Sequence, residues 1–226
     1  MVVAVDGPAG VGKSTVCARV AGETGFLYLN SGSCYRSISK AVLESGADPQ
    51  DPDIVLKIAR QCRFSMQAGA LQLNGLPVHD LQTDLIDRWS PLHSRIPEVR
   101  GIVNESLRTI ARTENVIVEG RDIGTVAFPA AEVKVFLDAS LEARAARRHA
   151  QGVSELSRDQ ILKGLDDRDR IDRTKPVGRL EIAAGALYVD TSDLTSEEVC
   201  AKVVREIRKR QSTGSQYNEP RTEKKP

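Results

Sequence analysis

Gly7-Pro8-Ala9-Gly10-Val11-Gly12-Lys13-Ser14 matches the pattern G-x-x-x-x-G-K-S/T at every fixed position. The Val-rich run Met1–Asp6 precedes it, and apolar residues recur at helical spacing over residues 14–23. A short apolar run that ends at a Gly-rich turn is typical of a strand buried on both faces. The sequence therefore predicts a strand, a phosphate-binding loop and a helix, in this order.

Each part of this motif, the P-loop, has a chemical use. The glycines let successive backbone N–H groups point into one concavity that holds phosphate oxygens, and the helix N-terminus adds its positive dipole end. Lys13 can reach the β- and γ-phosphates of a nucleotide, and the Ser14 hydroxyl can ligate Mg²⁺. The motif predicts a site for a nucleoside triphosphate with its Mg²⁺.

The composition is typical of one globular domain. Of the 226 residues, 40% are apolar and 28% are charged, which is enough to bury a core. Apolar runs such as Val116–Val118 and Val135–Leu137 fall far short of the roughly 18–20 residues that span a bilayer. The first residues include no basic region and no cleavage site, so we expect no secretory signal and no association with a membrane.

Cysteine and histidine usage indicates a reducing compartment. The four cysteines and three histidines are scattered along the chain, and no Cys-x-x-Cys pair occurs. This spacing argues against a disulfide framework and against a zinc site. We expect a soluble protein of the cytoplasm.

The net charge of +1 is unevenly distributed. Residues 208–226 carry six basic and two acidic side chains, which leaves 26 basic and 29 acidic residues in the rest of the chain. A slightly acidic body argues against a nucleic-acid surface, which needs a basic face. Residues 211–226 are rich in Ser, Gln, Lys, Glu and Pro, and we expect a disordered basic tail there. Contact of this tail with an acidic partner stays open as an alternative.

Strand-like and helical patterns alternate along the chain. Val-rich runs recur at residues 115–118, 133–137 and 186–189, with helical patterns between and after them. Two of the helical patterns open with a capping box, Ser157 with Gln160 and Thr195 with Glu198. This alternation predicts an α/β fold of three layers, in which helices cover both faces of a central parallel sheet.

One segment departs from the alternation. Residues 62–67 and 70–74 alternate apolar with polar side chains, and Asn74-Gly75 then precedes the short run Leu76–His79. This pattern predicts a small antiparallel sheet with a turn at Asn74-Gly75. The small sheet belongs to an insertion over about residues 36–100, between the first and second strand-like runs of the main sheet.

The sequence after the second Val-rich run favours a small kinase over other users of a triphosphate. The guanine-reading string Asn-Lys-x-Asp and the switch string Asp-x-x-Gly of GTPases do not occur. The run ends in a single acid, Glu119, and lacks the acidic pair of motor ATPases. The Arg121-Asp122 pair that follows suits the binding of an acceptor phosphate better than the activation of water.

Five basic residues outside the P-loop are candidates for binding substrate phosphates. They are predicted at loop edges or helix starts, away from the apolar stripes: Arg36, Arg100, Arg121, Arg168 and Lys175. Two anionic substrates repel each other, and planar bidentate arginines can bring them together. Solvated surface arginines remain the alternative for most of the 32 basic residues, including much of the charged run Asp166–Arg173.

Five motifs, in order along the chain, resemble those of the bacterial-type cytidylate kinases. They are Gly7–Thr15, Leu29–Arg36, Pro97–Arg100, Glu119–Val126 and Arg168–Asp172. The Ser-Gly-x-x-Tyr-Arg and Gly-Arg-Asp-x-Gly-Thr strings within them are independent of the P-loop. The resemblance spans about residues 1–208, and the predicted small sheet resembles the enlarged monophosphate-binding region of that family.

The resemblance implies a donor site and an acceptor site. The ATP site would comprise Gly7, Pro8, Ala9, Gly10, Val11, Gly12, Lys13, Ser14, Thr15 and Arg147, with Arg147 beside the adenine and Ser14 on the Mg²⁺. The CMP site would comprise Ser31, Arg36, Arg100, Arg121, Asp122, Arg168, Asp172 and Lys175. In that site Ser31 and Arg36 would lie beside the phosphate, Arg121 and Arg168 on phosphate or ribose, and Asp172 on the ribose hydroxyls. Arg100 and Asp122 would face cytosine, which presents acceptors at O2 and N3 and a donor at N4.

The activity implied is transfer of the γ-phosphoryl group of ATP to CMP or dCMP, with Lys13, Arg121 and Arg168 as the catalytic residues. The kinase domain would cover residues 1–210, work as a monomer and close a lid over residues 152–178. Two alternatives stay open. One is a P-loop kinase for UMP, another nucleotide or a small metabolite, and the other is a regulatory protein that hydrolyses its nucleotide slowly.

The sequence departs from the family pattern at a few positions. Asn30 stands where an Asp often precedes Ser-Gly, Lys175 where an Arg is usual, and Arg179 where Pro is common. Lysine is a point charge and cannot make the bidentate contact of an arginine, which weakens the role of Lys175. The serine expected at the base falls on Pro91, so the contact could come from Ser90 or Ser94 instead.

Overall fold

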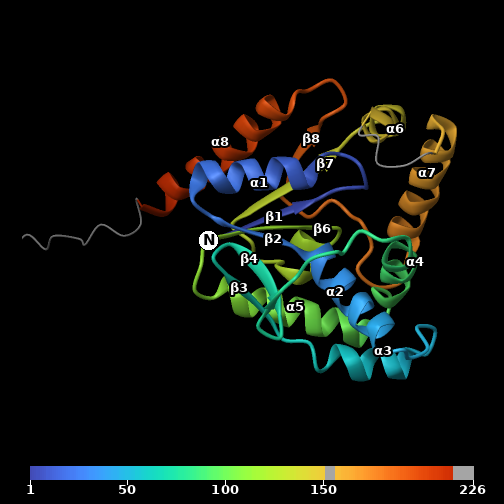
Figure 1. The fold of residues 1–226 in the computed structure, drawn as a ribbon. Coiled ribbons are helices and arrows are strands. Elements are labelled where there is room, and N and C mark those ends of the chain that lie inside the picture. The colour runs from blue at the N-terminus through green and yellow to red at the C-terminus, as the bar shows by residue number, and fades with distance from the viewer. Residues whose placement is uncertain (151–155, 216–226) are drawn as a thin grey trace, which may run out of the picture.

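The computed structural model describes residues 1–150 and 156–215, whose strands and helices alternate as predicted (Figure 1). The elements, in chain order, are β1 (Val2–Asp6), α1 (Lys13–Thr24), β2 (Leu27–Asn30), α2 (Ser31–Glu44), α3 (Pro52–Ala59), β3 (Phe64–Gln67), β4 (Ala70–Leu73), β5 (Leu76–Pro77), α4 (Asp84–His93), α5 (Pro97–Ala111), β6 (Val116–Gly120), the π-helical turn η1 (Ile123–Ala127), β7 (Val133–Asp138), α6 (Leu141–Ala150), α7 (Arg158–Thr174), β8 (Leu187–Asp190) and α8 (Ser196–Ser215).

Five parallel strands form the central sheet, in the order β2-β6-β1-β7-β8. β1 lies at its centre, and its Val5 is in register with Glu119 of β6 and Val135 of β7. All of β6 and the whole of β1 after Val2 are buried. Burial on both faces explains why these strands read as continuous apolar runs.

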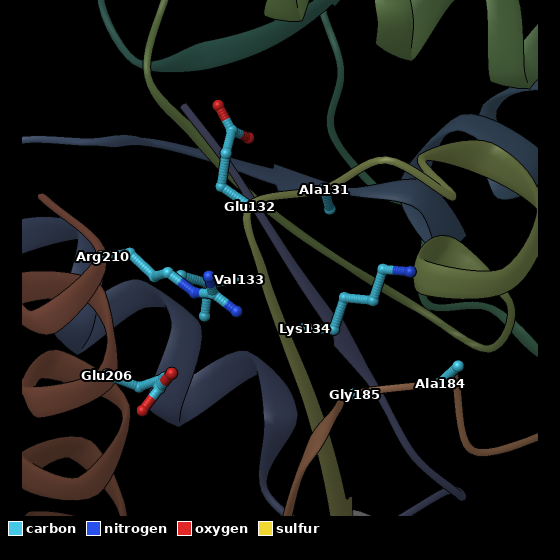
Figure 2. Close-up of a pocket in the computed structure, with 8 residues that line it drawn as sticks. All are labelled: Ala131, Glu132, Val133, Lys134, Ala184, Gly185, Glu206 and Arg210. Atoms are coloured by element: carbon cyan, nitrogen blue, oxygen red, sulfur yellow. The ribbon is translucent and has the colours of Figure 1, made fainter. Parts of the chain in front are cut away.

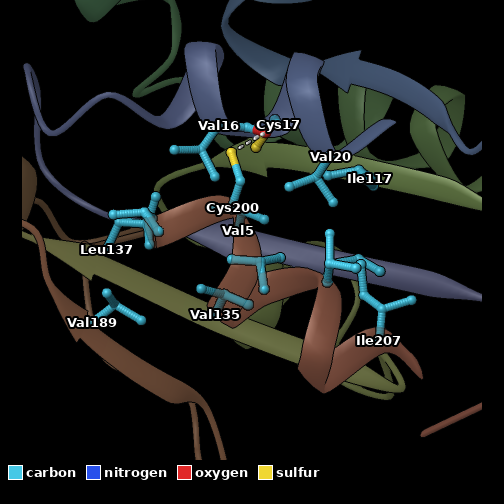
Figure 3. Close-up of a cluster of buried hydrophobic side chains, with 14 of the residues drawn as sticks. Val5, Val16, Cys17, Val20, Ile117, Val135, Leu137, Val189, Cys200 and Ile207 are labelled. Carbon is cyan, nitrogen blue, oxygen red and sulfur yellow. Dashed lines mark hydrogen bonds between the residues drawn. The ribbon is translucent and has the colours of Figure 1, made fainter. Parts of the chain in front are cut away.

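Helices cover both faces of this sheet. On one face Val16 and Val20 of α1 and Ile207 of α8 pack against Val5 and Val135 of the sheet (Figure 3). On the other face α2 and α5 pack on the sheet, and α3 packs on these two helices. The three-layer α/β fold predicted from the sequence is confirmed.

One strand of the main sheet was not predicted. β2 has only four residues, and Tyr28 and Asn30 interrupt its apolar pattern, so it does not read as a Val-rich run. It pairs with β6 at the edge of the sheet. The predicted insertion therefore follows the second strand in chain order, and its predicted first residue, Arg36, falls inside α2 rather than at a boundary.

The small antiparallel sheet is confirmed, with strand order β3-β4-β5. Asn74 (φ 53°) and Gly75 (φ 81°) both lie in the left-handed region, as a tight hairpin turn of this type requires. The side chain of Asn74 also accepts a hydrogen bond from the backbone N–H of Arg63 at 2.8 Å.

The predicted lid region contains α7, which opens with the predicted capping box of Ser157 and Gln160. α7 packs on α6 and on the P-loop through a small apolar cluster of Ala9, Ala145, Ile161 and Leu165. Residues 152–155 of the predicted lid lie outside the described residues.

The boundary predicted for the C-terminal tail is wrong by five residues. The second predicted capping box, Thr195 with Glu198, opens α8 as expected. The helix then continues to Ser215 and does not stop at residue 210, because the segment 211–215 contains nothing that breaks a helix before Gly214. Residues 216–226 lie outside the described residues. Within residues 1–150 and 156–215, no helix is both long enough and apolar enough to cross a membrane.

Candidate active site

The carboxyl ends of the parallel strands gather most of the predicted site residues at one edge of the sheet. β1 leads into the P-loop, β2 into Ser31, and β6 into the Arg121-Asp122 pair. In sheets of this kind, ligands bind at that edge, where loops from neighbouring strands diverge.

The P-loop has the backbone geometry that its glycines predict. Gly7 (φ 154°), Gly10 (φ 82°) and Gly12 (φ 89°) all have positive φ. At Gly7 a Cβ atom would lie 2.1 Å from the backbone oxygen of Leu137, so no larger residue fits there. The loop closes around Lys13, whose ammonium group donates to the carbonyl oxygens of Gly7 at 2.8 Å and Pro8 at 2.7 Å.

Lys13 is the centre of a cationic neighbourhood. Burial lowers the pKa of its ammonium group from 10.5 to about 7, and the cations of Arg121 and Arg168 add to this effect while Glu119 opposes it. Lys13, Arg121 and Arg168 come from three different elements, yet they lie close enough to influence one another. Such a concentration of positive charge suits a polyanionic ligand.

The buried carboxylate of Glu119 faces Ser14, the P-loop residue predicted to ligate Mg²⁺. Glu119, at the end of β6, is 4% exposed, and its Oε1 atom accepts hydrogen bonds from Ser14 Oγ at 2.8 Å and from Tyr28 at 2.8 Å. Asn30 donates to the same oxygen. Oε2 of Glu119 is buried and has no hydrogen-bond partner among the described residues. The sequence marked Glu119 only as the acid that closes a strand and did not reveal this contact.

Ser31 and Arg36 lie on the first turns of α2, beside the P-loop. Ser31 is 6% exposed, and its hydroxyl donates to the backbone oxygen of Glu119 at 2.7 Å. The side chain of Asn30 caps the helix by accepting from Ser33 N at 3.1 Å. Nη2 of Arg36 donates to Ser33 Oγ at 3.3 Å, and its buried Nε has no partner among the described residues.

Arg100 and Asp122 form a buried ion pair. Arg100 also donates to the backbone oxygen of Ser94 at 3.0 Å and lies 5.5 Å from the ring centre of Tyr35. Arg100 lies in the first turn of α5, as predicted, and its side chain is buried, with 4% exposed. At position 94 it is thus the backbone carbonyl, rather than a serine hydroxyl, that contacts the predicted base-reading residues. Gly178 packs closely on the same guanidinium, since a Cβ there would lie 2.3 Å from Nη2.

Asp172 pairs with Arg121, one of the cations near Lys13. Its carboxylate accepts from Arg121 Nε at 2.7 Å and lies 3.5 Å from Lys175 Nζ. Burial opposes the ionisation of Asp172, but the cations of Arg121, Lys175 and Arg168 outweigh it and hold the pKa below its ordinary value. Lys175 is itself 8% exposed, and burial lowers its pKa. Arg121 thus links Asp172 to the cations around Lys13.

Arg168 is exposed on α7 and lies well inside this helix, rather than at a loop edge or helix start as predicted. It has no hydrogen-bond partner among the described residues, unlike Arg121.

Arg147, on α6, has a different environment: it donates to the hydroxyl of Thr191 at 3.0 Å and to the backbone oxygens of Thr191 and Ser192. The structure therefore brings Arg168 to the cationic neighbourhood and places Arg147 against the loop after β8.

Asp6 is a further buried acid that the sequence did not single out. It ends β1 and accepts hydrogen bonds from the backbone N–H groups of Ile123 at 2.8 Å and Gly124 at 2.7 Å. Burial raises the pKa of its carboxyl from 3.8 to about 6. Since Arg121 and Asp122 come directly before this turn, Asp6 fixes the loop that carries them. No sequence pattern distinguishes such an acid from any other at a strand end.

Two surface hollows contain none of the predicted site residues. One, of about 160 Å³, lies at the amino end of β7 and is lined by residues such as Lys134, Glu206 and Arg210 (Figure 2). The other, of about 570 Å³, lies between α3, β3 and α5 and is lined by residues such as Leu56, Phe64 and Ile102. The candidate active site is therefore defined by its converging charges rather than by either hollow.

The family model and the curated relatives that match this chain carry the same description. A family model described as cytidylate kinase matches residues 3–209. A cytidylate kinase of Caldanaerobacter subterraneus subsp. tengcongensis is 39% identical over 92% of this chain and 94% of its own length. One of Limosilactobacillus reuteri is 36% identical over 92% and 96%. Among solved structures, an uncharacterized protein from Eubacterium ventriosum aligns with a TM-score of 0.53 at 8% identity, over 92% of this chain and 98% of that one, a likeness of fold alone.

Proposed function

From the premise that the chain belongs to the cytidylate kinase family, we propose that it transfers the γ-phosphoryl group of ATP to CMP or dCMP, giving ADP and CDP or dCDP. The observation that carries this proposal is the convergence of Lys13, Arg121 and Arg168 next to the buried Arg100–Asp122 pair. A cluster of cations beside a buried polar pair suits two phosphorylated ligands, one of which is recognised through its base.

Phosphoryl transfer needs little from the protein beyond positioning the two substrates and neutralising their negative charge. A phosphate oxygen of CMP attacks the γ-phosphorus of ATP in line with the leaving oxygen of ADP, and it is already ionised near neutral pH, so no general base is needed. Lys13, Arg121 and Arg168 neutralise the negative charge of the two ligands as they approach. Holding the reacting atoms in line supplies the rest of the rate.

The residues beside Ser14 fit a Mg²⁺ ion. The Ser14 hydroxyl and the carboxylate of Glu119 are both oxygen ligands, which Mg²⁺ prefers, and Oε2 of Glu119 is buried without a hydrogen-bond partner among the described residues. Mg²⁺ would neutralise charge on the phosphates when bound. Ser14 would hold it directly, and Glu119 would face it from the end of β6.

The Arg100–Asp122 pair accounts for the choice of base. The guanidinium can donate to the O2 and N3 acceptors of cytosine, and the carboxylate can accept from the N4 amino group. Uracil reverses this pattern at N3 and at O4. A buried site whose donors and acceptors match cytosine would leave polar groups unpaired if uracil were bound. The cost of these unpaired groups makes the site reject uracil.

The proposal also assigns roles to Asp172, which would bind the ribose, and to the lid over residues 152–178. Asp172 would accept from the ribose hydroxyls, and it would meet them in its ionised form because its pKa is low. Closure of residues 152–178 over the ligands would exclude water, which would otherwise take the phosphoryl group. We include in the proposal a single kinase domain that acts as a monomer in the cytoplasm.

A panel of acceptors tests the function directly. ADP release would be followed with ATP and Mg²⁺ in the presence of CMP, dCMP, UMP, AMP or no acceptor. Release that depends on CMP or dCMP and is far slower with the others supports the proposal. Preference for UMP or for a metabolite outside the panel would assign another kinase activity, and slow release that no acceptor changes would assign a regulatory nucleotide-hydrolysing protein.

A further inference from the structure

We propose that Arg144 and Asp169 are positioning residues that set how the helix α7 is rotated about its own axis where it packs beside the P-loop. No pattern in the sequence assigns a role to either residue. Through this orientation they set where Arg168 and Asp172 lie. The kinetic part of the inference rests on the proposed phosphoryl transfer, and the structural part does not.

Arg144 makes a separate contact with each of its three nitrogens. Nε donates to the backbone oxygen of Ala139 at 3.1 Å, Nη1 to that of Ala9 at 3.1 Å, and Nη2 to Asp169 Oδ2 at 2.7 Å. Ala9 belongs to the P-loop, and its neighbour Gly10 approaches Arg144 so closely that a Cβ there would lie 3.3 Å from Arg144 Cβ. Arg144 is 4% exposed, and its three hydrogen bonds are all made within the protein, so it joins the P-loop to α7.

Asp169 continues an apolar stripe of α7 toward the P-loop. Ile161, Leu165 and Asp169 recur at intervals of four, so they share one face of the helix, and all three are buried. The apolar part of this contact is small, consisting mainly of Ile161 and Leu165 against Ala9 and Ala145. Apolar contact is not directional, whereas a charge-assisted hydrogen bond is. The Arg144–Asp169 pair therefore fixes the rotation of α7 about its axis.

This rotation decides the position of two site residues. Successive residues of an α-helix are about 100° apart, which places Arg168 about 100° and Asp172 about 60° from Asp169 in the same sense. Both thus lie on the side of α7 next to the anchored face. Asp172 there accepts from Arg121, and Arg168 lies in the neighbourhood of Lys13. A turn of the helix by a fraction of one residue would move both away from Arg121 and the P-loop.

Stability alone gives a poor account of this pair. Burying an arginine and an aspartate costs desolvation energy that their attraction often only offsets, and apolar pairs of similar volume can be as stable or more so. Asp169 also keeps one buried oxygen, Oδ1, without a hydrogen-bond partner among the described residues. The small apolar cluster does not fix the orientation of α7, and we assign that role to the Arg144–Asp169 pair.

Single substitutions provide the first test, with initial rates measured well below each unfolding midpoint. Asp169→Ala should lower kcat for CMP at least tenfold. Asp169→Asn should stay within about threefold of the wild type, because an amide oxygen can accept from Nη2 and the amide nitrogen replaces an oxygen that has no partner. The matched control is Asp167→Ala, on the same helix, which removes an exposed ion pair with Arg170 and should leave kcat unchanged. Wild-type kcat for Asp169→Ala, or an equal loss in Asp169→Asn, would overturn the inference.

A double variant separates orientation from stability. Arg144→Met/Asp169→Leu replaces the pair by apolar side chains that fill the same space, and its unfolding midpoint should recover relative to Asp169→Ala. If the pair orients α7, kcat stays at least tenfold low in the double variant despite the recovered midpoint. Recovery of kcat together with the midpoint would assign the pair a merely structural role and refute the proposal.

Hydrogen exchange of the ligand-free protein tests the structural part without any substrate. Asp169→Ala should speed amide exchange both in α7 and in the P-loop around Gly10, because the pair joins the two, whereas Asp167→Ala should change neither. Faster exchange confined to α7 would refute the link to the P-loop. If the wild type fails to phosphorylate CMP, the proposed function falls, and the exchange data still decide whether Arg144 and Asp169 join these elements.

Discussion

At the scale of single residues, Lys13 makes the sharpest prediction for the P-loop. Lys13→Met should abolish phosphoryl transfer, because the charge it offers the transferred group contributes several kcal/mol in the transition state. The ligand-free protein should keep its unfolding midpoint, since the lost hydrogen bonds to Gly7 and Pro8 are balanced by no longer burying an ammonium group. ADP release and thermal unfolding measure the two outcomes. Near-full turnover of the variant would refute the assignment of the P-loop.

Asp122 makes a second prediction, on the choice of base. The structure pairs its carboxylate with Arg100 in a buried ion pair. Asp122→Asn replaces a pure acceptor by a group that can also donate to O4 of uracil. kcat/KM should fall more for CMP than for UMP, narrowing their ratio about tenfold or more, since unpaired buried polar groups cost roughly 1–3 kcal/mol each. An unchanged ratio would remove Asp122 from the base-reading residues.

Asp6 predicts a pH dependence of stability. Burial raises the pKa of its carboxyl from 3.8 to about 6 in the folded protein. Between these values the folded state binds more protons at Asp6 than the unfolded chain does, so the contribution of this group to stability falls as the pH rises through the window. Asp6→Asn removes the titration and changes the hydrogen bonds to Ile123 and Gly124 equally at every pH.

The measurement for Asp6 is therefore a difference between two proteins. The unfolding midpoint of the wild type minus that of Asp6→Asn should fall as the pH rises from 4 to 6.5 and then stay level. A difference that stays constant over that range, or that rises, would show that Asp6 does not titrate in the folded state as its burial predicts.

At the scale of elements, α8 predicts where the chain can be shortened. Ile207 is fully buried, whereas Arg210, Gln211 and Ser212 are exposed. Because the deleted segment 211–226 begins with the exposed residues Gln211 and Ser212, we expect its removal to leave activity and the unfolding midpoint within experimental error of the wild type. The control Ile207→Ala should cost about 2–5 kcal/mol by leaving a cavity in the core. A large fall of the midpoint on truncation would show that the removed segment packs on the body.

The elements also show what the sequence can and cannot predict. β1, β6 and β7 are buried on both faces and read as Val-rich runs, and the helices with capping boxes begin where predicted. β2 was missed because it is short and lies at an edge, where Tyr28 and Asn30 turn polar groups toward Glu119. The end of α8 was misplaced because composition alone does not determine where an exposed helix stops.

The site also has one part that a local sequence pattern predicts and another that it does not. The P-loop could be predicted from the sequence because its chemistry needs fixed residues at fixed spacing in one stretch. The Ser14–Glu119, Arg144–Ala9 and Asp6–Gly124 contacts join residues more than 100 positions apart. No local pattern marks such partners, and Arg144 stands in a helix whose other arginines look alike in the sequence. Only the fold distinguishes the buried arginine from its neighbours.

At the scale of the whole molecule, a nearly neutral chain concentrates positive charge at one place. The net charge is +1, yet Lys13, Arg121 and Arg168 lie close enough that the two arginines lower the pKa of the lysine. Their mutual repulsion destabilises the ligand-free protein. An anion bound there would relieve it, and a ligand that binds only the folded state raises stability by mass action.

Inorganic tripolyphosphate, which has the charge of the nucleotide without its base, should therefore raise the unfolding midpoint by several degrees. Sodium chloride at equal ionic strength should do much less, because screening acts on exposed charges generally and does not fill the P-loop. Arg168→Gln should reduce the gain from tripolyphosphate, while Arg170→Gln, an exposed neighbour that pairs with Asp167, should leave it unchanged. Equal gains in all three proteins would mean that the anion binds elsewhere and that Arg168 does not belong to the phosphate site.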